Sequence, residues 1–282
     1  MIKLAAFSDE ADSSLKGQIK ALKENGLSLM EVRGINGKSV INFTVEEAKD
    51  YQKEMRDEGV SAWSIGSPLG KVNIDTDFSE YSEKVKHVCE LANVFGTDKI
   101  RMFSFYKAYG DRDRVIDNLN KMVEIGKTFG VKMCHENEKD IYGDVADREV
   151  DLLDNVKGLY CVYDPANFIQ CGEKADKTLA LLHHRAIYFH IKDVIETTQE
   201  IVPAGFGDGK ISKLVADIKD DKVLTLEPHL TVFDGYADID KAKMKNKFLF
   251  TSPREAFDAA VKAIKDILVK DGYTERNGEF VK

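Results

Sequence analysis

The sequence predicts a parallel eight-stranded (β/α)8 TIM barrel, and three observations favour this fold. Short β-rich apolar runs alternate with longer amphipathic stretches along the chain. Eight such units within 282 residues match the ~250 residues that are typical of this barrel. The acidic turn Ser8-Asp9-Glu10-Ala11-Asp12 follows the first run and lacks the glycines of a nucleotide-binding turn, which argues against a doubly wound open sheet.

Eight apolar runs are interpreted as strands, and the segments between them as helices. In chain order the predicted strands are Ile2–Phe7, Leu29–Val32, Ser61–Ile65, Lys99–Phe103, Val131–Glu136, Tyr160–Asp164, Ala186–Lys192 and Val223–Glu227. The segments between them carry apolar residues at three- and four-residue spacing, as amphipathic helices do. Thr44 and Ser252 are each followed three residues later by a glutamate, which predicts a capping box at the start of a helix.

We expect one domain over residues 1–282, because no linker or low-complexity block interrupts the pattern. Residues at about 233–250 form a long insertion after the eighth strand, rich in lysine. This insertion is interpreted either as a lid or as a solvated helical excursion. The short C-terminal tail from about Asp271 is expected to fray or to pack on a neighbouring molecule.

Composition and charge exclude several classes of protein. A net charge of −8 disfavours a broad polyanion-binding surface, so we expect no nucleic acid partner. No stretch approaches the ~20 apolar residues that span a bilayer, and the N-terminus turns acidic too soon for a signal peptide. We therefore expect no membrane partner and a cytoplasmic location. The four cysteines lack Cys-x-x-Cys spacing and are interpreted as reduced thiols.

Ionisable residues stand at the ends of four successive predicted strands. They are Glu136, Asp164, His190 and Glu227. Function in such a barrel gathers at the C-terminal strand ends, and adjacent strands lie only ~4.8 Å apart. Each residue taken alone is more often a loop carboxylate, a turn residue or a core histidine. Together they predict a site for one divalent metal ion, because three crowded carboxylates need a cation. Such a donor set suits Mn²⁺, Mg²⁺, Co²⁺ or Zn²⁺ and does not choose among them.

The same segments resemble a known family. Glu-Asn after strand five, Asp-Pro-Ala-Asn after strand six, His-Ile-Lys-Asp after strand seven and Leu-Glu-Pro after strand eight are similar to the sugar phosphate isomerase/epimerase family of xylose isomerase-like barrels. The resemblance implies that Glu136, Asp164, His190 and Glu227 are metal ligands. It also implies that Glu136 and Glu227 face each other across a sugar and act as the acid/base pair. Dimers or tetramers are usual in proteins that resemble this one, so we expect this chain to form a homo-oligomer, either a dimer or a tetramer.

Two positions depart from the family pattern and put the usual substrate in doubt. Asn167 stands where members often carry a histidine that touches substrate, and Phe206 replaces the acid of a Gly-Glu-Gly element. The metal set is unaffected by either change.

The mechanism predicted from these groups is proton abstraction beside a carbonyl. A metal that binds two adjacent oxygens of a ketose or inosose acidifies the neighbouring C–H. One glutamate removes the proton and the other returns it, which gives epimerisation or isomerisation of a sugar or sugar phosphate. The glutamates must be partly buried, so that their pKa values rise into a working range.

Further residues are predicted to contact substrate around this set. They are Glu31, Arg33, Arg101, Asn167, Lys192 and His229. Lys192 lies on the same strand face as His190 and binds either substrate or a mouth carboxylate. His135 is expected to point away from the barrel axis, and the loop Gly205–Lys210 is a weak candidate for a phosphate cradle.

Two other functions use the same barrel. An inosose-type dehydratase would lose a β-hydroxyl from the same enolate. An apurinic-site endonuclease needs several metal ions, many histidines and a basic DNA-binding face, whereas this chain has six histidines and is acidic. A non-catalytic sugar-binding barrel is disfavoured by the intact carboxylates.

Overall fold

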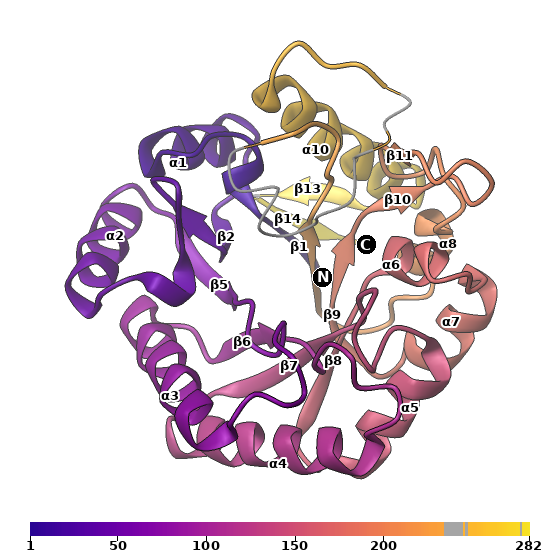
Figure 1. Cartoon of the computed structure of the whole chain (residues 1–282). Coiled ribbons are helices and arrows are strands. Elements are labelled where there is room, and N and C mark those ends of the chain that lie inside the picture. Colours follow the sequence, from indigo (N-terminus) through magenta and orange to yellow (C-terminus); the bar gives the residue numbers. More distant parts are fainter. Residues whose placement is uncertain (234–244, 246–247, 277) are drawn as a thin grey trace.

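A closed barrel of eight parallel strands forms the centre of the molecule, as predicted (Figure 1). The computed structural model describes residues 1–233, 245, 248–276 and 278–282. The barrel strands are β1 (Ile2–Ala6), β2 (Leu29–Val32), β5 (Ser61–Gly66), β6 (Lys99–Met102), β7 (Lys132–Glu136), β8 (Leu159–Tyr163), β9 (Ala186–Ile191) and β12 (Lys222–Leu226). Pairing of β1 with β12, in register from Ile2 opposite Lys222, closes the barrel. All eight predicted strands are confirmed to within one or two residues at each end.

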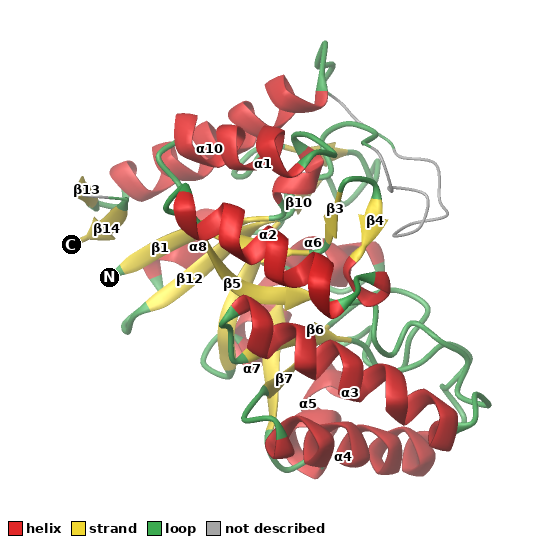
Figure 2. Cartoon of the chain, turned by 90° about the vertical axis from the view of Figure 1, so that its left-hand side faces the viewer, coloured by secondary structure: helices red, strands yellow, loops and turns green. Residues whose placement is uncertain are grey.

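Helices surround this barrel on the outside, and one or two of the described helices follow each barrel strand (Figures 1 and 2). They are α1 (Leu15–Glu24), α2 (Val45–Asp57), α3 (Phe78–Phe95), α4 (Arg112–Thr128), α5 (Ala146–Asn155), α6 (Pro165–Gln170), α7 (Ala175–Leu182), α8 (Ile211–Ala216) and α10 (Pro253–Lys270). Thr44 and Glu47 form the predicted capping box at α2. Ser252 caps α10, but Glu255 accepts from the Thr251 backbone instead of completing a box.

Apolar packing separates into two regions. Most buried apolar side chains lie in one cluster between the barrel and its helices. A smaller cluster contains Ala5, Cys134, Val162, Tyr188 and Val223, one from each of five barrel strands, and fills the barrel interior. The polar side chains at the strand ends therefore lie above a layer of packed apolar side chains, at the C-terminal mouth of the barrel.

Short elements decorate this mouth. The 3₁₀ turn η1 (Ser8–Glu10) follows β1, and the hairpin β3 (Gly34–Ile35) and β4 (Lys38–Ser39) follows β2, before the turn η2 (Val40–Asn42). A second hairpin, β10 (Asp193–Val194) and β11 (Ile201–Val202), follows β9. Figure 2 shows both termini at the other end of the barrel from β3 and β4.

The C-terminal residues correct one expectation. The tail was expected to fray or to pack on a neighbour, but β13 (Thr274–Arg276) and β14 (Glu279–Val281) form a hairpin on the chain's own barrel. Strand β14 runs antiparallel to the start of β1, where β2 does not yet pair, and buries Phe280. It thereby satisfies backbone groups that would otherwise form an open edge.

The predicted insertion, the length of the helices and the cysteines compare with the structure as follows. Most of the predicted insertion at 233–250 lies outside the described residues. Among the described helices, none is both long and apolar enough to cross a membrane. All four cysteines are free thiols, three buried and Cys171 half-buried.

Candidate active site

Four side chains from four successive strand ends meet at the barrel mouth. Glu136 ends β7, Asp164 follows β8, His190 lies in β9, and Glu227 follows β12. All four are buried, and one ligand atom of each lies within 4.8 Å of the others. We call these residues the four-residue ring. Three carboxylates and one imidazole without a thiolate form a donor set that fits a divalent ion.

The His190 imidazole lies at the centre of this ring. Its Nδ1 is 2.9 Å from Glu136 Oε1 and 3.3 Å from Glu227 Oε2, while Nε2 is 3.3 Å from Glu31 Oε2. Burial opposes protonation of the imidazole. The charges of the Glu136 and Glu31 carboxylates outweigh this effect and raise the pKa of His190 well above its usual value. Phe7 packs edge-on against the imidazole.

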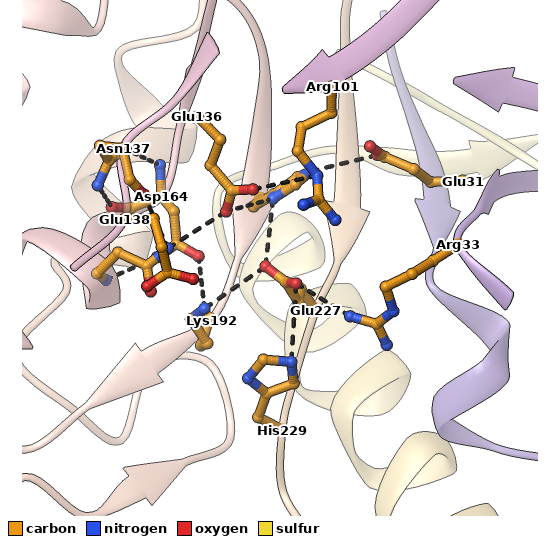
Figure 3. Close-up of polar contacts among 12 residues, drawn as sticks. Glu31, Arg33, Arg101, Glu136, Asn137, Glu138, Asp164, Lys192, Glu227 and His229 are labelled. Atoms are coloured by element: carbon orange, nitrogen blue, oxygen red, sulfur yellow. Dashed lines mark hydrogen bonds and ion pairs between the residues drawn. The ribbon is translucent and has the colours of Figure 1, made fainter. Parts of the chain in front are cut away.

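Asp164 has two roles, because its two oxygens point to different partners. Oδ1 accepts a hydrogen bond from the Asn167 backbone N–H at 2.9 Å and so caps α6, where Pro165 occupies the first turn. Oδ2 lies 3.0 Å from Lys192 Nζ (Figure 3). Burial raises the pKa of Asp164 to about 7, with the Glu136 and Glu227 charges acting in the same direction against Lys192.

Lys192 and Arg33 each neutralise Glu227. The Lys192 Nζ is 3.5 Å from Glu227 Oε2, and Arg33 Nη1 donates to Oε1 at 3.1 Å. Burial raises the pKa of Glu227, but Lys192 and His190 reverse the effect and hold this pKa well below its usual value. This corrects the expectation that burial would raise it. Lys192 pairs with mouth carboxylates, the second of the two interpretations that the sequence left open.

A second acidic group flanks the ring and includes two residues that the sequence analysis did not assign to the site. Arg33 donates to both oxygens of Asp9 and to Glu10 Oε1, at 2.9 to 3.1 Å. The His229 backbone N–H donates to Glu10 Oε2, and its Nε2 lies 3.4 Å from Oε1. Glu10, Glu227 and His229 are also compact enough for a metal ion. Arg33 contacts both of these carboxylates.

The remaining predicted contacts also reach the ring (Figure 3). Asn167 Nδ2 donates to Glu136 Oε1 at 3.3 Å, and Arg101 Nε lies 3.3 Å from Glu136 Oε2. Glu31 Oε1 accepts a hydrogen bond of 2.8 Å from the hydroxyl of Tyr188, a residue of the barrel interior. The structure thus brings every predicted substrate-contact residue to the mouth.

A cavity of about 320 Å³ opens beside the ring, on the side of β1, β2, β5 and β6. Its wall includes Asp9, Arg33, Lys38, Lys71 and Arg101, together with Gly66, Pro68 and residues of the β3–β4 hairpin. Arg33 and Arg101 also contact Glu227 and Glu136, so the cavity adjoins the ring. We call it the basic cavity.

Two sequence-based expectations outside the ring have clear outcomes. His135 points away from the barrel axis, as expected, and its Nδ1 lies 2.6 Å from Glu149 Oε2 of α5, with both side chains fully buried. The glycine loop cannot cradle phosphate in this arrangement, because its N–H groups are occupied. Asp193 accepts from Gly205, Gly207 and Gly209 at 2.8 to 3.1 Å.

This architecture matches one protein family and several solved structures. The model of the xylose isomerase-like TIM barrel family matches residues 19–267. No curated protein matches the chain. Among solved structures, the chain is similar to the probable 3-DHS dehydratase AsbF from Bacillus anthracis, with a TM-score of 0.73 and 16% identity over 94% of this chain and 99% of that one.

Two further solved structures show the same fold. L-ribulose 3-epimerase has a TM-score of 0.73 and 15% identity, over 96% of both chains. The IOLI protein, solved with a zinc atom bound, has a TM-score of 0.72 and 14% identity, over 95% of this chain and 98% of that one.

Proposed function

Because the chain belongs to the xylose isomerase-like TIM barrel family, we propose that it is a divalent-metal-dependent enzyme that isomerises or epimerises a sugar or sugar phosphate. The observation that carries this proposal is the four-residue ring of Glu136, Asp164, His190 and Glu227. Its ligand atoms lie within 4.8 Å of one another at the end of the barrel where such enzymes act. The IOLI structure contains zinc, and the L-ribulose 3-epimerase structure shares the fold, which agrees with this chemistry.

The ring residues would hold one Mn²⁺, Mg²⁺, Co²⁺ or Zn²⁺ ion. Such an ion, when bound, polarises a substrate carbonyl and stabilises the negative charge that develops on proton removal. Asp164 is suited to ligation alone, because one of its oxygens is fixed as the cap of α6. Glu136 and Glu227 cap no helix, and the contacts of their oxygens are with side chains.

The two glutamates are the acid/base pair of this proposal. Both contact the same His190 Nδ1, so the two carboxylates converge on one side of the imidazole. Each also has its own arginine, Arg101 at Glu136 and Arg33 at Glu227. One carboxylate removes the proton next to the carbonyl, and the other delivers a proton to the opposite face or to the neighbouring carbon. The low pKa of Glu227 makes it a weak base in the metal-free protein.

The test is deuterium exchange in heavy water with a panel of ketoses and inososes, after metal analysis of the purified protein. We expect deuterium at the carbon next to the carbonyl. Replacing the base in Glu136→Gln should lower the exchange rate by about 10²- to 10⁴-fold while the circular dichroism spectrum is unchanged. The control Glu124→Gln changes an exposed glutamate of α4 and should exchange at the wild-type rate.

Other results would revise the proposal. Full exchange by Glu136→Gln would contradict the glutamate-base mechanism. A product lighter by one water would assign elimination, the dehydratase reaction, to the same site. Cleavage of abasic DNA without any sugar exchange would contradict the isomerase proposal as a whole.

A further inference from the structure

We propose that the basic cavity binds an anionic group of the substrate, a carboxylate or a phosphate, and that Arg101 is its principal anchor. The inference rests on the proposed function in one respect, namely that the molecule in the cavity is the one that reacts at the ring. It adds a charge requirement, which the ring alone does not impose.

The cavity wall carries an excess of positive charge. Arg33, Lys38, Lys71 and Arg101 line it, and Asp9 is the one acidic residue among the described residues of the wall. Both oxygens of Asp9 accept hydrogen bonds from Arg33, so this carboxylate presents little free charge to a ligand. A positive concave surface on a chain of net charge −8 is a local feature, because the average field of the protein has the opposite sign.

Arg101 is the cation of this wall whose donors are least committed. Its side chain is 5% exposed, yet it donates no hydrogen bond to any residue in the described part of the chain, and its buried Nε lacks a partner. Glu136 lies near this Nε at 3.3 Å but without hydrogen-bond geometry. A buried guanidinium with unused N–H groups loses hydration without replacement, unless a ligand supplies the acceptors.

The other cations of the wall are engaged by carboxylates. Arg33 donates to Asp9, Glu10 and Glu227. Lys38 donates to both oxygens of Glu47, and Lys71 lies 3.1 Å from Glu138. They therefore contribute charge around the cavity, whereas Arg101 is able to contribute directed, paired hydrogen bonds of the kind that planar carboxylates and phosphates accept.

Two aromatic rings hold the cations on this wall side by side. The Cζ atoms of Arg33 and Arg101 lie 4.3 Å and 5.3 Å from the centroid of Phe7. Phe103 is shared in the same way by Arg101 Cζ at 4.6 Å and Lys71 Nζ at 4.4 Å. Contact with a ring face stabilises a cation without using its N–H donors. Figure 3 shows Arg33 and Arg101 on one side of the site, opposite Asp164 and Lys192.

The competing explanation is that Arg101 only neutralises Glu136. It predicts no preference for an anionic ligand, whereas an anion subsite predicts a preference that depends on Arg101. Binding measurements separate the two without turnover.

The experiment compares three ketoses that differ only at the terminal carbon. They are D-fructose, D-fructose 6-phosphate and D-fructuronate, in which that carbon is neutral, phosphorylated and carboxylated. Their dissociation constants are measured by titration calorimetry on the full chain after metal removal. We expect at least one anionic ketose to bind about ten- to a hundredfold more tightly than D-fructose, as charge-assisted hydrogen bonds provide. The tighter anionic ketose identifies which anion the cavity takes.

Variants assign this preference to its residues. Arg101→Gln should remove most of the preference for the anionic ketose, and Lys71→Gln should reduce it. The matched control Lys99→Gln removes a positive charge from the other end of the same strand, β6, and should keep the wild-type preference. If Arg101→Gln does not fold, Lys71→Gln and the wild-type comparison decide the question.

The proposal is overturned by equal affinities for the three ketoses, or by an anion preference that survives in the folded Arg101 variant. Failure of the proposed function has a different signature, which is the absence of deuterium exchange with all three ketoses by the metal-loaded protein. Anion binding without exchange would retain the subsite and contradict the isomerase proposal.

Discussion

Gly66 shows how a missing side chain shapes the mouth of the barrel. It ends β5, and a Cβ at this position would lie 2.4 Å from Cε1 of Phe7 and 3.3 Å from Nη2 of Arg101. Only glycine leaves room for the aromatic ring beside the guanidinium. No sequence pattern singles out this glycine, because its role depends on contacts with side chains from two other parts of the barrel.

The substitution Gly66→Ala is therefore expected to displace Phe7 and to lower the free energy of unfolding by about 1–3 kcal/mol, as overpacking does. Urea denaturation measures this change. The control is Gly110→Ala, where an added Cβ meets nothing within 4 Å. Equal stability of the two variants would show that the mouth tolerates the shift.

At the scale of elements, the pattern of the strands predicts the barrel and its four ring residues well. Apolar runs that end in Glu136, Asp164, His190 and Glu227 are local signals, and parallel strands bring such ends together. In the sequence, Asp9 and Glu10 argue only against a nucleotide-binding turn and a signal peptide. Their place in the site follows from Arg33, a contact between different elements that no spacing reveals.

The loop Gly205–Lys210 differs most from its sequence-based interpretation at this scale. Glycines at 205, 207 and 209 favoured an anion cradle, but the anion they bind is the chain's own Asp193. Asp193 also accepts from the Val194 backbone N–H, so its carboxylate fixes the hairpin and the loop together.

Asp193→Asn should loosen this loop, because an amide nitrogen would face two N–H donors in place of a carboxylate oxygen. We expect a loss of about 1–3 kcal/mol in stability and faster hydrogen exchange at Gly205 and Gly207. The control Asp217→Asn changes an exposed aspartate at the end of α8. Unchanged exchange in Asp193→Asn would mean that the loop holds its shape without the carboxylate.

At the scale of the whole molecule, stability depends on pH through buried carboxyl groups. Burial raises the pKa of Glu10 from 4.5 to about 8, even though Arg33 lowers it. The folded state therefore holds a proton that the unfolded chain releases. Stability from this group is fully present below about pH 4.5 and is lost as the pH rises through about 8.

Glu10→Gln removes this proton uptake. Relative to the wild type, the variant should become more stable as the pH rises from 5 to 8, by up to about 1.4 kcal/mol per pH unit. Urea denaturation of the metal-free proteins across this range gives the difference. A difference independent of pH would mean that Glu10 is ionised in the folded protein.

The most direct measurement of the central claim is the binding of a divalent ion to the ring. Elemental analysis and equilibrium dialysis of the wild type with Mn²⁺, Mg²⁺, Co²⁺ and Zn²⁺ should give one tightly bound ion per chain. Loss of a residue that hydrogen-bonds a metal ligand weakens metal binding by ~10- to 100-fold. Asp164→Asn removes a ligand itself and should weaken the binding by more than that. The control Asp147→Asn changes an exposed aspartate and should leave the affinity unchanged. A wild type without a bound ion, or an Asp164 variant with undiminished affinity, would contradict the account.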